Sequence, residues 1–169
     1  MDEQDRKERC CAFTGHRPEK LSMSEYEVRR LLEEGIINAY DDGYRVFISG
    51  AAKGTDLWAA DIVLRLRKKH KEVKLICAIP FPPSENSRAK PEQDDYSRIV
   101  SSADEVVYVC DHYFRCCFQL RNKWMIDRAS RLIAVWNGQA GGTKNAIIYA
   151  KRSGIEIINL IDAVQQNSQ

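Results

Sequence analysis

The chain of 169 residues is 44% hydrophobic and 30% charged, a balance typical of a folded domain and not of a disordered segment. Its 26 Lys and Arg residues against 24 Asp and Glu residues give a net charge of +2, so charge alone offers no argument for a nucleic acid or a membrane surface as partner. Residues 1–9 are almost all charged or polar, and no apolar run approaches the roughly 18 residues of a membrane span. We therefore expect a cytoplasmic protein without a signal peptide, an anchor or a membrane partner.

Short apolar runs alternate with stretches of helical periodicity along the chain. Their β-branched residues, such as Val46 and Ile48, favour strands, and continuous apolar runs are typical of strands that are covered on both faces of a parallel sheet. We predict an α/β fold: a Rossmann-like, doubly wound, mostly parallel sheet of about six strands with helices on both faces. One domain spans residues 1–169, with a core over about 10–160 and frayed ends. The predicted strands are Cys10–Thr14, Arg45–Ser49, Val73–Ile79, Glu105–Cys110, Arg131–Trp136 and Ile155–Leu160, and the predicted helices are Glu25–Tyr40, Thr55–Lys69, Glu92–Ala103, Phe118–Ala129 and Thr143–Ser153.

The six cysteines are expected to be thiols, because a chain without a secretory signal folds in a reducing compartment. Cys77 and Cys110 lie inside apolar runs and are interpreted as buried packing residues. The remaining four form two adjacent pairs, which lack the spacing that favours zinc. We expect no metal site.

Distinctive residues follow the predicted strands, at residues 14–18, 49–56, 80–86 and 137–144. In an open parallel sheet, ligands bind beside the carboxyl ends of the strands, where the strand order reverses. These loops therefore predict a ligand site at that edge.

Each candidate in these loops has two interpretations. Gly141 and Gly142 precede a helix and either let a phosphate approach its N-terminus or form a turn capped by Thr143. Asp56 either accepts hydrogen bonds from a ribose diol or complements a helix dipole. Arg17 either binds an anion or pairs on the surface.

Further residues have the same ambiguity. His16 either serves a ligand, as a hydrogen-bond donor or as an acid or base, or stabilises its own turn. Asn122 lies on an apolar helical stripe and must bond either backbone or a ligand, while Arg121 beside it reaches towards a pocket mouth. Tyr113 and Phe114 either stack on a base or pack as a lid.

The order of these motifs resembles the SLOG (SMF/DprA–LOG) superfamily, and its YpsA-like branch most of all. The resemblance spans about Cys10 to Leu160 and rests on four motifs in the same order. The motifs are residues 15–17, 49–56, 118–123 and 141–143, and the ligand-binding residues that they single out are Gly15, His16, Arg17, Ser49, Gly50, Lys53, Gly54, Asp56, Arg121, Asn122, Gly141, Gly142 and Thr143.

The resemblance implies a pocket for a nucleotide-like small molecule, such as a nucleoside phosphate or an NAD or ADP-ribose derivative, with no cofactor required. Dimers are common among relatives, so a homodimer or another protein partner is also compatible with it. Our first hypothesis is binding or sensing of such a ligand, with Gly141, Gly142 and Thr143 on phosphate, Arg17 or Lys53 as its counter-charge, Asp56 on ribose and Asn122 on a polar edge.

The second hypothesis is cleavage or transfer of a nucleotide N-glycosidic bond, as in LOG relatives. The glutamate that follows the glycine-threonine loop there is absent here, since Lys144, Asn145 and Ala146 follow Thr143. Asp56 or Asp127 would have to replace it. The third hypothesis is a DprA-like binder of single-stranded nucleic acid, against which the near-neutral charge argues.

Overall fold

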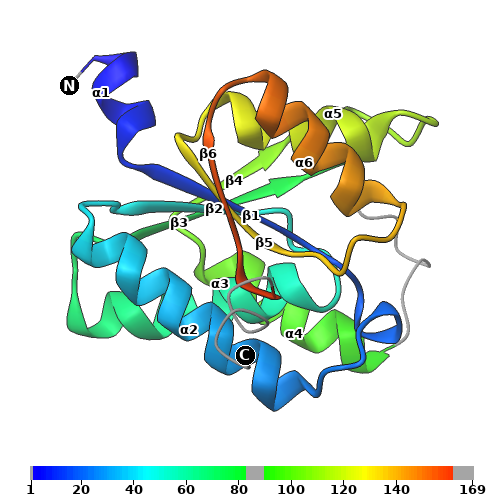
Figure 1. The fold of residues 1–169 in the computed structure, drawn as a ribbon, viewed down its shortest axis with the longest axis horizontal. Helices are drawn as coiled ribbons and strands as arrows, with labels where there is room; N and C mark the ends of the chain where they lie inside the picture. Colours follow the sequence, from blue (N-terminus) through cyan, green and yellow to red (C-terminus); the bar gives the residue numbers. More distant parts are fainter. Residues whose placement is uncertain (1, 83–89, 162–169) are drawn as a thin grey trace.

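A computed structural model describes the backbone of residues 2–82 and 90–161 and the side chains of residues 2–82 and 95–161. It contains a six-stranded sheet in the order β4-β3-β2-β1-β5-β6. All five strand pairings are parallel, which confirms the predicted α/β class (Figure 1). The strands are β1 Cys10–Gly15, β2 Val46–Ser49, β3 Lys74–Ile79, β4 Glu105–Tyr108, β5 Arg131–Val135 and β6 Glu156–Asn159, and the helices are α1 Glu3–Glu8, the short 3-10 helix η1 Pro18–Lys20, α2 Glu25–Asp41, α3 Thr55–Lys69, α4 Lys90–Ser102, α5 Cys117–Asp127 and α6 Gly142–Arg152.

The helices cover the two faces of the sheet unequally. Helices α2, α3 and α4 lie below the sheet in Figure 1, and α5 and α6 lie above it. Alternate residues of β1 enter the two cores: Cys11 and Phe13 pack with α2 and α3, whereas Cys10 and Ala12 pack with α5 and α6. Both cores are apolar, as expected for strands buried on both faces.

The amino-terminal segment differs from its prediction as a frayed end. Residues Glu3–Glu8 form a short helix although none of them is buried. Local capping explains this helix, because the Asp2 carboxylate accepts a hydrogen bond from the N–H of Asp5 and acidic residues occupy its first turn. The predicted frayed tail at residues 165–169 lies outside the described residues.

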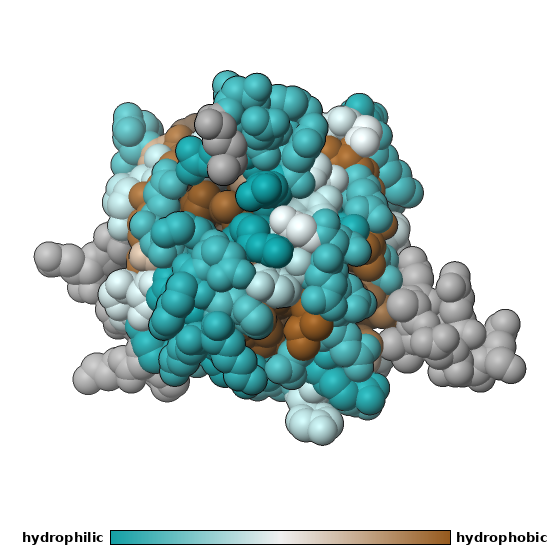
Figure 2. Space-filling view, turned by 90° about the vertical axis from the view of Figure 1, so that its left-hand side faces the viewer, coloured by the Kyte–Doolittle hydropathy of each residue, from teal (hydrophilic) through white to brown (hydrophobic). Residues whose placement is uncertain are grey.

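A hollow of about 550 Å³ lies between α1 and α5, at the end of the molecule that carries the amino ends of the strands. Figure 2 looks onto this end and shows brown hydrophobic surface recessed among teal hydrophilic side chains. Cys10, Ile48 and Ile76 contribute from the sheet, and Trp124 contributes from α5.

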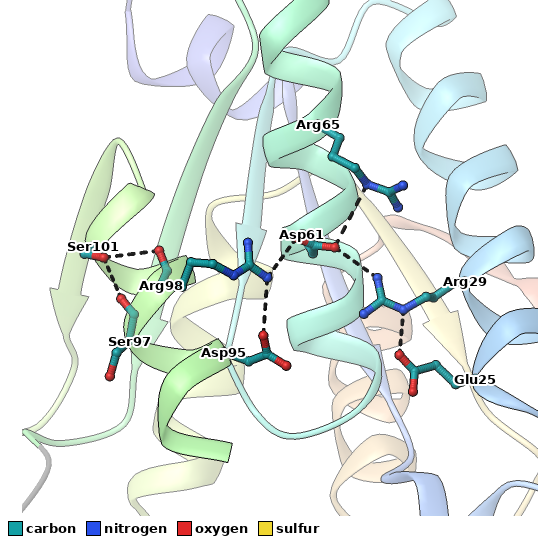
Figure 3. Close-up of polar contacts among 8 residues, drawn as sticks. All are labelled: Glu25, Arg29, Asp61, Arg65, Asp95, Ser97, Arg98 and Ser101. Atoms are coloured by element: carbon teal, nitrogen blue, oxygen red, sulfur yellow. Dashed lines mark hydrogen bonds and ion pairs between the residues drawn. The ribbon is translucent and has the colours of Figure 1, made fainter. Parts of the chain in front are cut away.

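One carboxylate joins α2, α3 and α4, the three helices on one face of the sheet. Asp61 of α3 pairs with Arg29 of α2 and with Arg98 of α4, each at 3.0 Å, and more loosely with Arg65 at 4.0 Å (Figure 3). Its side chain is only 19% exposed. This cluster fixes α2 and α4 against α3.

The chain order reverses between β1 and β5, which pair from Cys11 with Arg131 to Gly15 with Val135. The loops after β1, β2, β3 and β5 therefore meet at the carboxyl edge. Within the described residues 2–82 and 90–161, no helix is long and apolar enough to cross a bilayer.

Candidate functional site

A pocket of about 260 Å³ lies at the carboxyl edge, beside the ends of β2 and β3. Its walls come from the loops after β1, β2 and β3 and from α3, α4 and α5. Three cationic side chains line it together with apolar and aromatic groups. The described lining residues are Arg17, Gly50, Ala51, Ala52, Lys53, Leu57, Ile79, Pro80, Tyr96, Phe118 and Arg121.

Arg121 is the most enclosed of the three cations, with 6% of its surface exposed. Its Nη1 donates hydrogen bonds to the carbonyl of Gly50 at 2.6 Å and, at 3.4 Å, to that of Ala78. Its Nε donates to Oδ1 of Asn122 at 2.9 Å. Burial lowers the pKa of the guanidinium and the nearby Asp56 opposes this effect, but an arginine stays charged throughout the physiological range. The pocket therefore has a fixed positive charge in its wall.

Asp56 lies behind this wall and is not among the residues that line the pocket. Burial raises the pKa of Asp56 to about 6, while Arg121 and the backbone N–H of Ala52 act in the opposite direction. Its Oδ1 has no hydrogen-bond partner among the described residues. The carboxylate is thus placed to adjust the charge around Arg121.

Glycine at position 50 is required by this arrangement. A Cβ there would lie 2.6 Å from Nη1 of Arg121 and 2.7 Å from Oδ2 of Asp56. The preceding Ser49 holds the loop, because its hydroxyl accepts the N–H of Ala51 and donates to the carbonyl of Asp56. Ala51 has a φ of 53°, a strained conformation that is often found beside functional sites.

The loops after β1 and β2 are joined by Thr55, whose hydroxyl donates to the carbonyl of His16. A side chain at Gly15 would overlap that of Thr55. Gly54 packs against Pro18 in a conformation with a φ of 89°. These contacts hold the loops after β1 and β2 against each other.

Gly141 and Gly142 lie at the start of α6 and belong to a second group of predicted residues, at the reversal point between β1 and β5. Gly141, and not Thr143, is the N-cap of α6, and Lys20 lies close to it. A Cβ at Gly142 would meet no atom within 4 Å. Neither glycine nor the buried Thr143 lines the 260 Å³ pocket.

His16 also belongs to this second group. It is 3% exposed, and its Nε2 has no hydrogen-bond partner among the described residues. Burial lowers the pKa of His16. A hydrogen bond with Asn137 acts in the opposite direction, and the positive charge of Lys20 lowers the pKa further. The imidazole is therefore disposed to be neutral near pH 7.

Two other predicted residues lie elsewhere. Asn122 borders a groove between α5 and α6 of about 290 Å³. Asp127 is at the far end of α5, where it accepts a hydrogen bond from the Tyr149 hydroxyl and borders the hollow at the amino ends of the strands. The structure does not bring Asp127 together with Asp56, because Asp127 is the last residue of α5 and borders the hollow at the amino ends of the strands, whereas Asp56 lies beside Gly50 at their carboxyl ends.

Sequence reasoning missed the aromatic side of the pocket. Phe118 was predicted as the first residue of a helix, and it is 44% exposed at the pocket wall. Phe81 contacts it edge to face, with ring centroids 5.9 Å apart. The density of aromatic residues at 112–118 was the available signal. Among the described residues, no group of three or more His, Cys, Asp or Glu side chains is arranged to hold a metal ion.

The YpsA family model, described as the YspA SLOG family, matches residues 11–158. The chain therefore belongs to this family, as its motifs indicated. A similar relative is the uncharacterized SPbeta prophage-derived protein YoqJ of Bacillus subtilis, which is 33% identical over 67% of this chain and 72% of its own length. A UPF0398 protein of Bacillus cereus is 25% identical over 88% of this chain and 85% of its own.

Solved structures share the fold. DprA from Streptococcus pneumoniae superposes with a TM-score of 0.63 and 20% identity, covering 89% of this chain and 50% of that one. DprA from Helicobacter pylori superposes with a TM-score of 0.60 and 15% identity, covering 98% of this chain and 75% of that one. The protein TM1055 superposes with a TM-score of 0.58 and 16% identity, covering 88% of this chain and 72% of its own.

These neighbours correct one expectation. We expected nucleic acid to be disfavoured as a partner because of the near-neutral charge, and this exclusion is wrong. The structure of the Helicobacter pylori protein describes a single-stranded DNA binding mode on this fold. Net charge is a poor criterion here because phosphates are contacted by local cations, whatever the balance of the remaining surface.

Proposed function

We propose that the chain binds a phosphate-bearing nucleotide ligand in the 260 Å³ pocket. The observation that carries this proposal is the composition of the lining: three cations and no carboxylate among the described residues. Arg17, Lys53 and Arg121 supply the counter-charge for phosphate, and Phe118 offers a ring face for a base.

The existing ion pair of Lys53 is compatible with this role. Its ammonium lies 3.5 Å from the carboxylate of Glu19, and both side chains are largely exposed. Exposed pairs of this kind contribute about 0–1 kcal/mol. A phosphate, with its greater charge, would compete with Glu19 at little cost.

The size of the pocket supports a nucleoside phosphate as the unit that is bound. Pockets for drug-sized ligands usually measure about 300–1,000 Å³, and this one is slightly smaller. A dinucleotide such as NAD, or ADP-ribose, would place one half in the pocket and the other half along the carboxyl edge.

Binding is better supported than hydrolysis of an N-glycosidic bond. A hydrolase needs an acid or nucleophile within reach of the reacting bond, and Asp56 lies behind Gly50 while Asp127 lies at the other end of α5. Single-stranded nucleic acid, the ligand named for the Helicobacter pylori neighbour, presents the same phosphate and base groups and stays a candidate.

Thermal unfolding with and without ligand tests the proposal. AMP, ADP-ribose, NAD and inorganic phosphate are the probes, and a ligand at 100 times its Kd should stabilise by about 2.7 kcal/mol, or about 5–10 °C for a chain of this size. Arg17→Gln should abolish the shift.

Lys68→Gln is the matched control, because it removes one positive charge from the exposed carboxyl-terminal turn of α3, away from the pocket. A shift that survives Arg17→Gln, or no shift with any probe, would refute the assignment of this pocket.

A further inference from the structure

Three aromatic rings form a strip that starts at the pocket and continues outside it. Phe81 contacts Phe118 at a centroid distance of 5.9 Å and Tyr113 at 5.5 Å, with interplanar angles of 80° and 74°. Phe118 is 44% exposed and Tyr113 64% exposed. We call Phe81, Phe118 and Tyr113 the aromatic strip.

The backbone that carries Tyr113 is held in place. The buried Cys117 thiol accepts the N–H of Phe114 at 2.9 Å and donates to the carbonyl of His112 at 3.3 Å. The N–H of Cys117 also donates to the carbonyl of Phe114. These bonds close the segment on itself at the start of α5, so Tyr113 is presented to solvent by a defined turn and loses little freedom when a ligand binds.

Only Phe118 belongs to both the pocket lining and the strip. A ligand that fills the pocket and contacts Phe118 therefore has Phe81 and Tyr113 as its next surface. Arg115, two residues after Tyr113, is exposed in the same segment. Exposed rings beside cations are the combination that binds single-stranded nucleic acid, in which bases stack on aromatic faces while cations follow the backbone.

We propose that the aromatic strip stacks the base adjacent to the one in the pocket, so that the partner is a single-stranded nucleic acid of at least two nucleotides. This inference rests on the proposed function of the pocket. It adds that the ligand is a strand, and it assigns Tyr113 as a specificity-determining residue that distinguishes a strand from a mononucleotide.

Fluorescence anisotropy of a labelled thymidine octanucleotide, competed by unlabelled thymidine monophosphate, dinucleotide and tetranucleotide, tests the inference. The dinucleotide should bind about 5- to 150-fold more tightly than the monophosphate, the range for one stacked base. Tyr113→Ala should remove this gain and leave the affinity for the monophosphate unchanged, because Tyr113 does not line the pocket. Tyr113→Phe should retain it.

The matched control is Tyr26→Ala, which removes a ring that is 78% exposed on α2 and should change neither affinity. Equal affinities for monophosphate and dinucleotide, or a gain that survives Tyr113→Ala, would overturn the strip and leave the pocket assignment intact. Absence of binding by every probe would overturn both. Self-association that depends on Tyr113, without strand binding, would show that the strip contacts protein and would also overturn the inference.

Discussion

Arg121 links the fold to the pocket at the scale of single residues. Its guanidinium is buried against two backbone carbonyls, close to Asp56 and beneath Gly50. A buried cation needs such partners to compensate for its lost hydration. Removing one member of a buried ion pair leaves the charge of the other uncompensated. The residue that gives the pocket its charge is therefore also a structural residue.

Arg121→Met should lower the free energy of unfolding by about 3–5 kcal/mol, since Asp56 would be left as a buried carboxyl without its counter-charge. Urea denaturation measures this change. Arg128→Met, on the same helix, removes an exposed guanidinium that lies over the ring of Trp124 and should cost no more than about 1 kcal/mol. Equal losses in the two variants would contradict the assigned role of Arg121.

Asp56 predicts a pH dependence of ligand affinity. Its pKa is about 6, so the carboxyl is largely neutral at pH 5 and ionised at pH 7. Ionisation compensates part of the charge of Arg121, and the affinity for an anion should fall on the order of tenfold as pH rises through 6. A phosphodiester ligand is required for the measurement, because a phosphomonoester itself titrates near that pH.

Asp56→Asn should remove this dependence while leaving any contribution from His16, whose pKa is lowered by burial. Isothermal titration calorimetry with a thymidine dinucleotide between pH 5 and pH 7.5 would measure the affinity of the wild type and of the variant. Parallel curves for the variant and the wild type would show that Asp56 is not the titrating group.

At the scale of elements, Asp61 joins α3 to its two neighbours. Burial alone would raise the pKa of Asp61, but hydrogen bonds and charges from Arg29 and Arg98 lower it overall. A carboxyl with a lowered pKa in the folded state stabilises the protein above its unfolded pKa of about 4, and this stabilisation is lost as pH falls through the folded pKa.

Asp61→Asn should therefore destabilise the protein by about 1–3 kcal/mol at pH 7 and by less at pH 3, where the protonated fraction of the carboxyl is greater. Urea denaturation at the two pH values gives the comparison. Asp95→Asn, which removes a carboxylate that is 66% exposed in the same cluster, should change stability by at most about 0.5 kcal/mol. A loss for Asp61→Asn that is the same at both pH values would argue against ion pairing as its source.

A substitution at the start of α6 tests whether Gly141, Gly142 and Thr143 bind phosphate. Gly142→Leu should leave stability within about 1 kcal/mol, because Gly142 is exposed and a Cβ there meets no atom within 4 Å. If the N-terminus of α6 holds a phosphate, as its glycine pair predicts, the bulky residue should abolish binding in the same titration. Gln139→Leu, exposed in the same loop, is the control. Unchanged affinity for Gly142→Leu would limit the site to the 260 Å³ pocket.

At the scale of the whole molecule, the fold was predictable because its signals are local and repeated. Strands covered on both faces, such as β5, appear as continuous apolar runs, and the helices between them show their periodicity. Helix α1 was not predictable in this way, because it buries none of its residues and depends on a single cap.

The site was predictable only in part. The loops were found by their positions after strands, yet the sequence does not state which loop residues share a pocket. Arg121 reaches Gly50 across 71 positions, and Asp127 is separated from Asp56 because it lies at the other end of α5 from the pocket. Phe118 contacts Phe81, which follows β3, and helical periodicity does not contain a tertiary contact of this kind.

We propose that the carboxyl edge beside β2 and β3 binds a nucleotide through Arg17, Lys53 and Arg121. Titrating a thymidine dinucleotide into the labelled protein and following its backbone amide resonances locates the ligand directly. If this assignment is correct, the shifts are concentrated at residues 15–20, 49–56 and 112–121. Shifts confined to the hollow between α1 and α5, or saturation of the sample without any shift at residues 49–56, would contradict it.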